Sequence, residues 1–268
     1  MIYNTIIMSF NYVLCIILFI STCTCIYCHC HIEHFKEESE WKVIQTTPSI
    51  VDVPKKVHLN WLTYAKNYER FIIDDDECIK FLEEHYDIHH VIKFKNLTTG
   101  AHKADLFRYA WLYIHGGIYC DIKTVLIKNI NKIFTDTTKC YMMYTDYEFA
   151  NGERIYNGII ATPPKNPIML ALLKGAMSIQ NTDDYLYNCR QGYQIVKRFC
   201  VNNEIRAGHN ETLSNVPDIE FFIETPLAAS ECEYRLDRYG MCMFILDQDG
   251  YPLFKVRHSD YPWKNSGT

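Results

Sequence analysis

The segment AHKADLFRYAWLYIHGGIYCD at 101–121 restricts the fold more than any other feature of the chain. Its apolar residues over 101–113 gather on one flank of a helix, and two glycines then follow, as is common where helices end. The apolar residues 118–120 predict a short strand, with Asp121 at its carboxyl end. Helix and strand in direct succession favour an open α/β sheet, in which ligands bind outside the carboxyl ends of the strands.

Strand and helix alternate on either side of this segment. Strands are predicted at 53–61, 69–76, 124–127 and 158–161, and helices at 76–84 and 168–179. The acidic run at 74–76 is interpreted as a strand end and helix cap, because a carboxylate there accepts hydrogen bonds from free backbone amides. We find no internal repeat and no Gly/Ser-rich linker, so a single α/β domain is predicted over 51–268.

The first 32 residues contain no Asp, Glu, Lys or Arg. The run from Thr5 to Cys28 is long enough to cross the hydrocarbon core of a bilayer as a helix. A cleaved signal peptide has a basic first region and a shorter apolar stretch, so an uncleaved signal anchor over 1–32 is favoured. Residues 33–50 are polar and predict a stem. The chain is therefore expected to be a single-pass type II membrane protein with a lumenal domain, in the Golgi or another secretory compartment.

Cysteines and sequons bear on this compartment. Four of the 12 cysteines crowd into CTCIYCHC at the membrane boundary. Acylation or membrane packing is favoured there over zinc, because a helix end at a membrane supplies no tetrahedral enclosure. Five cysteines after residue 139 allow a disulfide in an oxidising lumen, with its connectivity left open. Sequons at Asn96 and Asn210 are compatible with a glycoprotein.

The charge balance excludes one class of partner. Lys and Arg number 27 against 32 Asp and Glu, which gives a net charge of -5. A protein without a basic excess is poorly suited to neutralise a phosphate backbone, so no nucleic-acid partner is expected. A composition of 48% hydrophobic and 14% aromatic residues also excludes a disordered chain.

The order of these motifs resembles the sugar-binding domain of glycosyltransferase family 32. Its members share a helix with Asp-x-x-Arg, a Gly-Gly-x-Tyr turn and strand, and an Asp-x-Asp element, and the matching sequence here is AHKADLFRYAWLYIHGGIYCDIKT. VPKKVHLNW at 53–61 is similar to the family's opening segment, and NGIIATPPKNP at 157–167 to a third one. ETPLAAS from Glu224 is similar to a Thr-Gly-Pro element with its glycine replaced. The resemblance covers about residues 51–263.

This resemblance implies a GT-A fold and a retaining glycosyltransferase. Its donor would be a nucleotide sugar, a UDP- or GDP-hexose, and its acceptor a glycan, a lipid or a protein. Breaking the bond between sugar C1 and the nucleoside diphosphate places negative charge on the leaving phosphate, so catalysis needs a cation there. The rival hypothesis is a catalytically degenerate relative that binds a sugar or nucleotide sugar without transferring it.

The resemblance also implies roles for individual residues. Asp105 and Arg108 hold sugar hydroxyls, Trp61 stacks near the base, Trp263 belongs to a closing element over the diphosphate, Asn157 lies on the acceptor side, and Asp121 is the first acid of Asp-x-Asp. The residues alone leave plainer alternatives open. They are an exposed ion pair for Asp105 and Arg108, a core side chain for Trp61 and a turn residue for Asn157.

Lys123 stands where the family has the second acid of Asp-x-Asp. An ammonium group cannot coordinate a cation, which puts the usual divalent metal, Mn²⁺ or Mg²⁺, in question. In one reading Lys123 neutralises the leaving phosphate itself, so that Asp121 and Lys123 form the catalytic pair. In the other, Asp121 and His258 hold a weakened metal site. The sequence leans towards the second reading, because Asp121 keeps its place in the motif.

Overall fold

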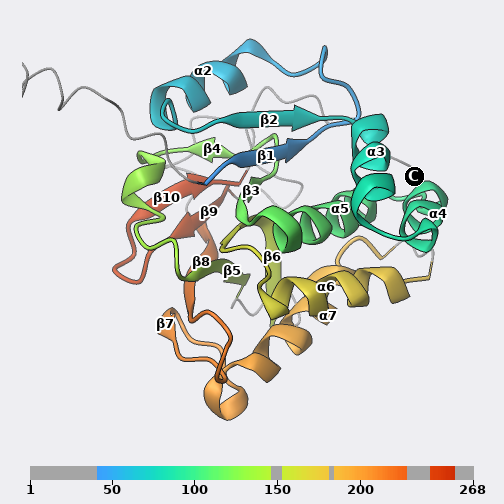
Figure 1. Cartoon of the computed structure of the whole chain (residues 1–268). Helices are drawn as coiled ribbons and strands as arrows, with labels where there is room; N and C mark the ends of the chain where they lie inside the picture. Colours follow the sequence, from blue (N-terminus) through green and yellow to red (C-terminus); the bar gives the residue numbers. More distant parts are fainter. Residues whose placement is uncertain (1–40, 146–152, 181–183, 228–241, 257–268) are drawn as a thin grey trace, which may run out of the picture. The chain divides into compact units, whose positions relative to one another are not determined.

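Figure 1 shows the computed structural model, which describes residues 41–145, 153–180, 184–227 and 242–256. All of these belong to one compact unit, 39–268. Within the described ranges we find no helix that is both long and apolar enough to cross a membrane. The predicted anchor over 1–32 lies outside these ranges, as do Trp263 and His258.

A mixed sheet runs through the unit. Its strands are β1 (Val43–Thr46), β2 (Arg70–Ile73), β3 (Gly117–Cys120), β4 (Val125–Leu126), β5 (Cys140–Thr145), β6 (Arg154–Thr162), β7 (Gly208–Asn210), β8 (Ile219–Leu227), β9 (Cys242–Leu246) and β10 (Pro252–Lys255). The strand order is β2-β1-β3-β6-β5-β8-β9-β10-β4, with β7 paired to β8. β3 is parallel to β1 and β5 to β8, whereas β6 is antiparallel to β3 and β5. The carboxyl ends of β1, β3, β5 and β8 therefore share one edge with the amino end of β6.

Helices cover both faces of this sheet. They are α2 (Lys55–Tyr64), α3 (Asp75–His85), α4 (Ile88–Asn96), α5 (Gly100–His115), α6 (Pro167–Ser178) and α7 (Tyr187–Val196). Neighbouring residues of one strand enter different cores, because strand side chains alternate between faces. Ile44 packs in the cluster that contains residues of α3 to α7, and Val43 packs in the cluster that contains residues of α2. Figure 1 accordingly shows α2 apart from the other helices.

Most of the predicted elements are confirmed. The strands expected at 69–76 and 158–161 correspond to β2 and β6, and the strand expected at 124–127 is the shorter β4. The helices expected at 76–84, 101–113 and 168–179 correspond to α3, α5 and α6. Asp74 caps α3 in a reciprocal capping box with Glu77, so the acidic run is indeed a helix cap. The prediction of an α/β fold is confirmed as a mixed α/β domain.

The strand predicted at 53–61 is wrong, because most of this segment forms α2. Val57 and Trp61 are the buried residues of that helix, four positions apart, and this spacing places them on one helical face. Pro54 occupies the N-cap position with an extended backbone, and a proline there opens a helix as readily as a strand. The helical spacing was present in the sequence and outweighs the local β propensity of the valines.

The predicted stem over 33–50 is also wrong for its final residues. β1 lies within it and pairs with β2 on one side and β3 on the other. Val43, Ile44 and Gln45 are all fully buried. A short strand that is covered on both faces shows no alternation of polar and apolar residues, so its sequence lacks the usual strand signal. The folded unit therefore begins ahead of the predicted boundary at residue 51.

Candidate active site

Asp121 lies directly after β3, at the edge that the parallel strands share. Its backbone N–H donates to the carbonyl of Gly158 at 2.7 Å, and its backbone carbonyl accepts from Gln45 Nε2 at 3.3 Å. The hydroxyl of Tyr119 donates to Asp121 Oδ1 at 3.1 Å. A Cβ atom at position 158 would lie 2.3 Å from the ring end of Tyr156 and 2.8 Å from Asp121 Oδ2, so a larger residue there would displace both side chains. Neighbouring strands thus hold the backbone of Asp121, and Tyr119 of β3 holds its carboxylate, while the Asp121 side chain remains 19% exposed.

Arg108 on α5 connects the two motif acids. Its Nη2 atom lies 3.4 Å from Asp105 Oδ1 and 3.4 Å from Asp121 Oδ1. The guanidinium also lies over the ring of Tyr119, 4.2 Å from its centroid. Burial favours the neutral form of Arg108, but Tyr119 and the two carboxylates outweigh it and raise its pKa. Because Asp105 and Arg108 are each only 4% exposed, the alternative of an exposed ion pair is wrong.

Two asparagines complete the surroundings of Asp105. Asn157 Nδ2 donates to Asp105 Oδ1 at 3.2 Å, and Asn188 Nδ2 on α7 donates to Asp105 Oδ2 at 2.9 Å. Arg108 donates to the backbone carbonyl of Asn157. The side-chain oxygens of both asparagines are buried without a hydrogen-bond partner among the described residues. An unsatisfied buried acceptor costs about 1–3 kcal/mol, so these oxygens are suited to accept from the hydroxyls of a ligand.

Asn157 lies within β6 and is therefore not a turn residue. Its contacts with Asp105 and Arg108 place it beside the residues expected to hold the donor sugar. Nothing in the sequence around Asn188 pointed to a role, because its position depends on how α7 packs against β6. The tertiary arrangement alone brings it to Asp105.

Lys123 lies on the other side of Asp121. Its Nζ atom is 3.5 Å from Asp121 Oδ2, and its side chain is 20% exposed. Burial favours the neutral amine, but the carboxylate of Asp121 outweighs it, so the pKa of Lys123 is raised and the ammonium stays charged. Both oxygens of Asp121 therefore face a cation, one from Arg108 and one from Lys123.

This arrangement does not fit a divalent ion on Asp121. A metal needs carboxylate lone pairs directed towards it, and here both oxygens are engaged by fixed cations that would repel the ion. The parts of the chain that the structure describes contain no group of three His, Cys, Asp or Glu able to hold a metal. The predicted ligand His258 lies outside them.

A second acid, Glu224, lies at the same edge of the sheet. It is paired in register with Thr145, the last residue of β5, whose hydroxyl donates to Glu224 Oε2. Arg154 Nη2 lies 3.9 Å from the same oxygen. Burial raises the pKa of Glu224, although Thr145, Arg154 and Lys123 each lower it in part. The sequence carried a signal, since Glu224 follows the apolar residues 221–223 as Asp121 follows 118–120, although β8 continues to Leu227.

Trp61 is 2% exposed, in the apolar cluster under α2. The guanidinium of Arg70 covers its ring, 5.2 Å from the centroid. Arg70 Nε in turn donates to Gln45 Oε1 at 2.6 Å, and Gln45 reaches the backbone of Asp121. The described structure thus shows Trp61 as a core residue linked to the site through Arg70. Its stacking on a nucleotide base stays a prediction.

Comparison with known proteins agrees with this site. Residues 52–139, about a third of the chain, match the family described as "Glycosyltransferase sugar-binding region containing DXD motif". An uncharacterized glycosyltransferase of Acanthamoeba polyphaga mimivirus is 31% identical over 139 residues, 52% of this chain and 54% of that protein. The initiation-specific alpha-1,6-mannosyltransferase of Saccharomyces cerevisiae is 41% identical over 71 residues, 26% of this chain and 15% of the yeast protein.

Among solved structures, PaToxG glycosyltransferase is 20% identical with a TM-score of 0.40, over 58% of this chain and 68% of that one. The chain spans about half the length of the mimivirus relative, and less of the yeast enzyme. The resemblance found in the motifs is confirmed. Residues 52–139 of this chain match the family of glycosyltransferase sugar-binding regions with a DXD motif, and Lys123 stands in the place of the second acid.

Proposed function

We propose that the chain is a retaining glycosyltransferase with a GT-A fold, which transfers a hexose from a nucleotide sugar to a glycan, lipid or protein acceptor. One observation carries the proposal. Arg108 lies between Asp105 and Asp121, 3.4 Å from each, at the edge of the sheet where open α/β folds bind ligands. These are three charged residues of the family motif, and they form one connected site.

The donor sugar binds on the side of Asp105. The carboxylate of Asp105 is held by Arg108, Asn157 and Asn188. The side-chain oxygens of the two asparagines then accept hydrogen bonds from the sugar hydroxyls. A sugar with the wrong hydroxyl configuration leaves these oxygens unpaired, and the resulting penalty selects among donors. We assign Asn157 to this donor side rather than to the acceptor side, because its contacts are with Asp105 and Arg108.

The diphosphate binds on the side of Lys123. When the bond from C1 to the diphosphate breaks, negative charge grows on the leaving phosphate, and fixed cations stabilise that charge without reorganising. Lys123 and Arg108 are the two cations next to Asp121 that do this. The acceptor hydroxyl then bonds to C1 on the face that the diphosphate leaves, and its proton passes to the departing phosphate oxygen.

Mannose is the first hexose to test, since one relative is named a mannosyltransferase. We place the enzyme in the secretory pathway, anchored by residues 1–32, in the Golgi or a similar lumen. Two further observations support that compartment. Cys242 is disulfide-bonded, and the sequon residue Asn96 is exposed at the end of α4.

The test is release of nucleoside diphosphate by the purified full chain from a panel of UDP- and GDP-hexoses. Asp121→Asn is the active-site variant, and Asp76→Asn, an exposed acid in the first turn of α3, is the matched control. We expect Asp121→Asn to lose at least about 10² in turnover, as for one electrostatic group at a reacting centre, and Asp76→Asn to keep wild-type rates. Donor binding without turnover in the wild type would instead support the degenerate binder.

A further inference from the structure

Tyr156 brings an unused hydroxyl to the carboxylate of Asp121. Its oxygen is buried and has no hydrogen-bond partner among the described residues. A Cβ atom at position 158 would lie 2.3 Å from this oxygen and 2.8 Å from Asp121 Oδ2, so the two oxygens are separated by no more than the sum of these distances. Asp121 Oδ2 is also the oxygen that faces Lys123. The hydroxyl of Tyr156 therefore lies on the same side of Asp121 as Lys123.

Glu224 lies further along the same face of the sheet. Arg154 and Tyr156 point to one face of β6, because they are two residues apart in a strand. Arg154 is paired in register with Thr145, and Thr145 with Glu224. Thr145 and Arg154 both contact Glu224 Oε2, which leaves Oε1 to accept a hydrogen bond from a ligand. The sheet thus carries two buried polar groups with capacity for a ligand, the hydroxyl of Tyr156 and the carboxyl of Glu224.

Electrostatic interactions connect these two groups with the proposed diphosphate site. Burial raises the pKa of Tyr156 well above its usual range, and the charges of Asp121 and Glu224 raise it further. Burial also raises the pKa of Glu224, and Lys123 is one of the groups that lower it in part. The hydroxyl of Tyr156 therefore stays protonated at neutral pH within the electrostatic reach of both acids. A phenol in this position is able to donate to one ligand oxygen and to accept from another.

The stereochemistry of a retaining transfer assigns this region to the acceptor. The acceptor hydroxyl bonds to C1 on the face that the diphosphate leaves, so the acceptor must lie beside the diphosphate. The donor sugar occupies the other side of the site, with Asp105. We propose that Tyr156 and Glu224 form the acceptor subsite, where they bind neighbouring hydroxyls of a neutral sugar or polyol. This inference rests on the proposed function, and it names the acceptor class that the proposed function leaves open.

The charges of this subsite favour an uncharged acceptor with several hydroxyls. Arg154 Nη2 lies 3.9 Å from Glu224 Oε2, so the two charges offset each other and neither is left for an ionic acceptor. An alkyl chain would leave the buried hydroxyl of Tyr156 and the carboxyl of Glu224 without partners, which is costly for buried polar groups. A single serine or threonine hydroxyl of a protein satisfies only one of them. Adjacent hydroxyls of a sugar ring satisfy both.

The test separates transfer from donor hydrolysis, in which water takes the place of the acceptor. The full chain, Tyr156→Phe and Glu224→Gln are given the UDP- or GDP-hexose that the wild type turns over. Nucleoside diphosphate release is measured without an acceptor, and transfer of labelled hexose is measured to methyl α-mannoside, myo-inositol, a Ser/Thr peptide and octanol. We expect both variants to keep donor hydrolysis within about twofold and to lower kcat/KM for methyl α-mannoside or myo-inositol by at least about tenfold, as for one lost hydrogen bond.

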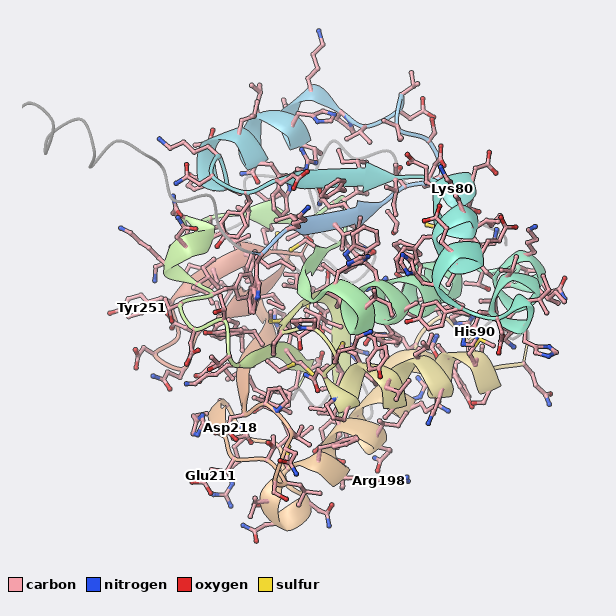
Figure 2. The ribbon with its side chains drawn as sticks, in the orientation of Figure 1. Lys80, His90, Arg198, Glu211, Asp218 and Tyr251 are labelled. Carbon is pink, nitrogen blue, oxygen red and sulfur yellow. The ribbon has the colours of Figure 1, made fainter. Side chains whose placement is uncertain are left out.

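Tyr141→Phe and Asp218→Asn are the matched controls. Tyr141 is a buried tyrosine near the amino end of β5, and its hydroxyl accepts from the backbone N–H of Asp136 at 2.9 Å. Asp218 is a hydrogen-bonded acid just before the amino end of β8, and Figure 2 labels it beside β7. Both residues lie at the ends of their strands opposite the edge that carries Asp121. We therefore expect both controls to keep wild-type rates of hydrolysis and transfer.

Each outcome decides between the two proposals. If the wild type releases nucleoside diphosphate from no donor, the proposed function and this inference fall together. If the variants lose hydrolysis as much as transfer, or if either variant keeps wild-type transfer, the inference is overturned and the proposed function stands. Transfer by the wild type to the peptide or to octanol, with none to methyl α-mannoside or myo-inositol, also overturns the inference alone.

Discussion

Replacing Lys123 tests how the leaving phosphate is neutralised. In Lys123→Met the ammonium is lost while most of the side-chain volume is kept. Its Nζ atom lies 3.5 Å from Asp121 Oδ2, and the pKa of Lys123 is raised by that carboxylate, so a full positive charge is removed at neutral pH. In the variant, the diphosphate would meet Asp121 with only Arg108 to offset its charge.

The size of the effect follows from this geometry. Two unit charges about 3.5 Å apart attract by about 5 kcal/mol at an effective dielectric constant of about 20. Desolvation of the ammonium cancels part of this energy, and the loss of one fixed donor at an oxyanion typically costs about 2.7–4 kcal/mol. We therefore expect Lys123→Met to lower kcat by about 10²- to 10³-fold, and Lys123→Arg to retain most of the activity because it keeps the charge.

The assay is nucleoside diphosphate release with and without EDTA. Lys132→Ala serves as a control, because Lys132 is an exposed lysine in the turn after β4. Wild-type turnover should be unchanged in EDTA and show no stimulation by Mn²⁺. If EDTA abolishes turnover and Lys123→Asp keeps or increases it, then a metal does this work and the reasoning from Lys123 is refuted.

Three further predictions concern the site and the compartment. Gly158→Ala should lower turnover, because its Cβ would lie 2.3 Å from the Tyr156 ring end and 2.8 Å from Asp121 Oδ2 and would displace both; wild-type turnover in a folded variant would contradict this. Burial raises the pKa of Glu224 above its ordinary 4.5, so its contribution to stability is present below about pH 4.5 and is lost as pH rises through the folded-state pKa. Glu224→Gln should therefore match the wild type in acid and melt at a higher temperature at neutral pH, and a lower melting temperature there would count against it. In secretory cells, endoglycosidase should remove a glycan from Asn96, which is exposed, and none from Asn210, which is 8% exposed and donates to two backbone carbonyls; a mass shift lost in Asn210→Gln would reverse this assignment.

The order of elements around Asp121 could be predicted from the sequence, because the signals there are local. An amphipathic helix, two glycines and an apolar run specify α5, the turn and β3 without reference to the rest of the chain. Residues that depend on long-range pairing could not be predicted. β1 is buried on both faces and lacks alternation, and Asn188 reaches Asp105 only because α7 packs against β6.

Motif resemblance identified Asp105, Arg108 and Asp121 but gave no contacts between them. The i, i+3 spacing of Asp105 and Arg108 on one helix predicted that these two residues are neighbours. The spacing did not show whether the pair is buried in a site or exposed to solvent, because both arrangements have the same spacing. Burial decides between the two, and burial is set by β6 and α7, which lie far along the chain. For the same reason the sequence leaned towards a metal on Asp121, since the positions of Arg108 and Lys123 around its carboxylate become visible only in the folded chain.

The charge of the motif is consistent with a working site in which Lys123 stands in the place of the second acid. In an Asp-x-Asp element the two carboxylates and a divalent ion sum to zero charge before the donor binds. Here Asp121 and Lys123 also sum to zero without any metal, and adding a divalent ion would leave the pair with two positive charges in a partly buried place. Such an excess is costly to desolvate, and Lys123 would repel the ion from a few ångströms away. A lysine in place of the acid therefore disfavours a metal, and it supplies a cation 3.5 Å from Asp121 Oδ2, next to the position that we propose for the leaving phosphate.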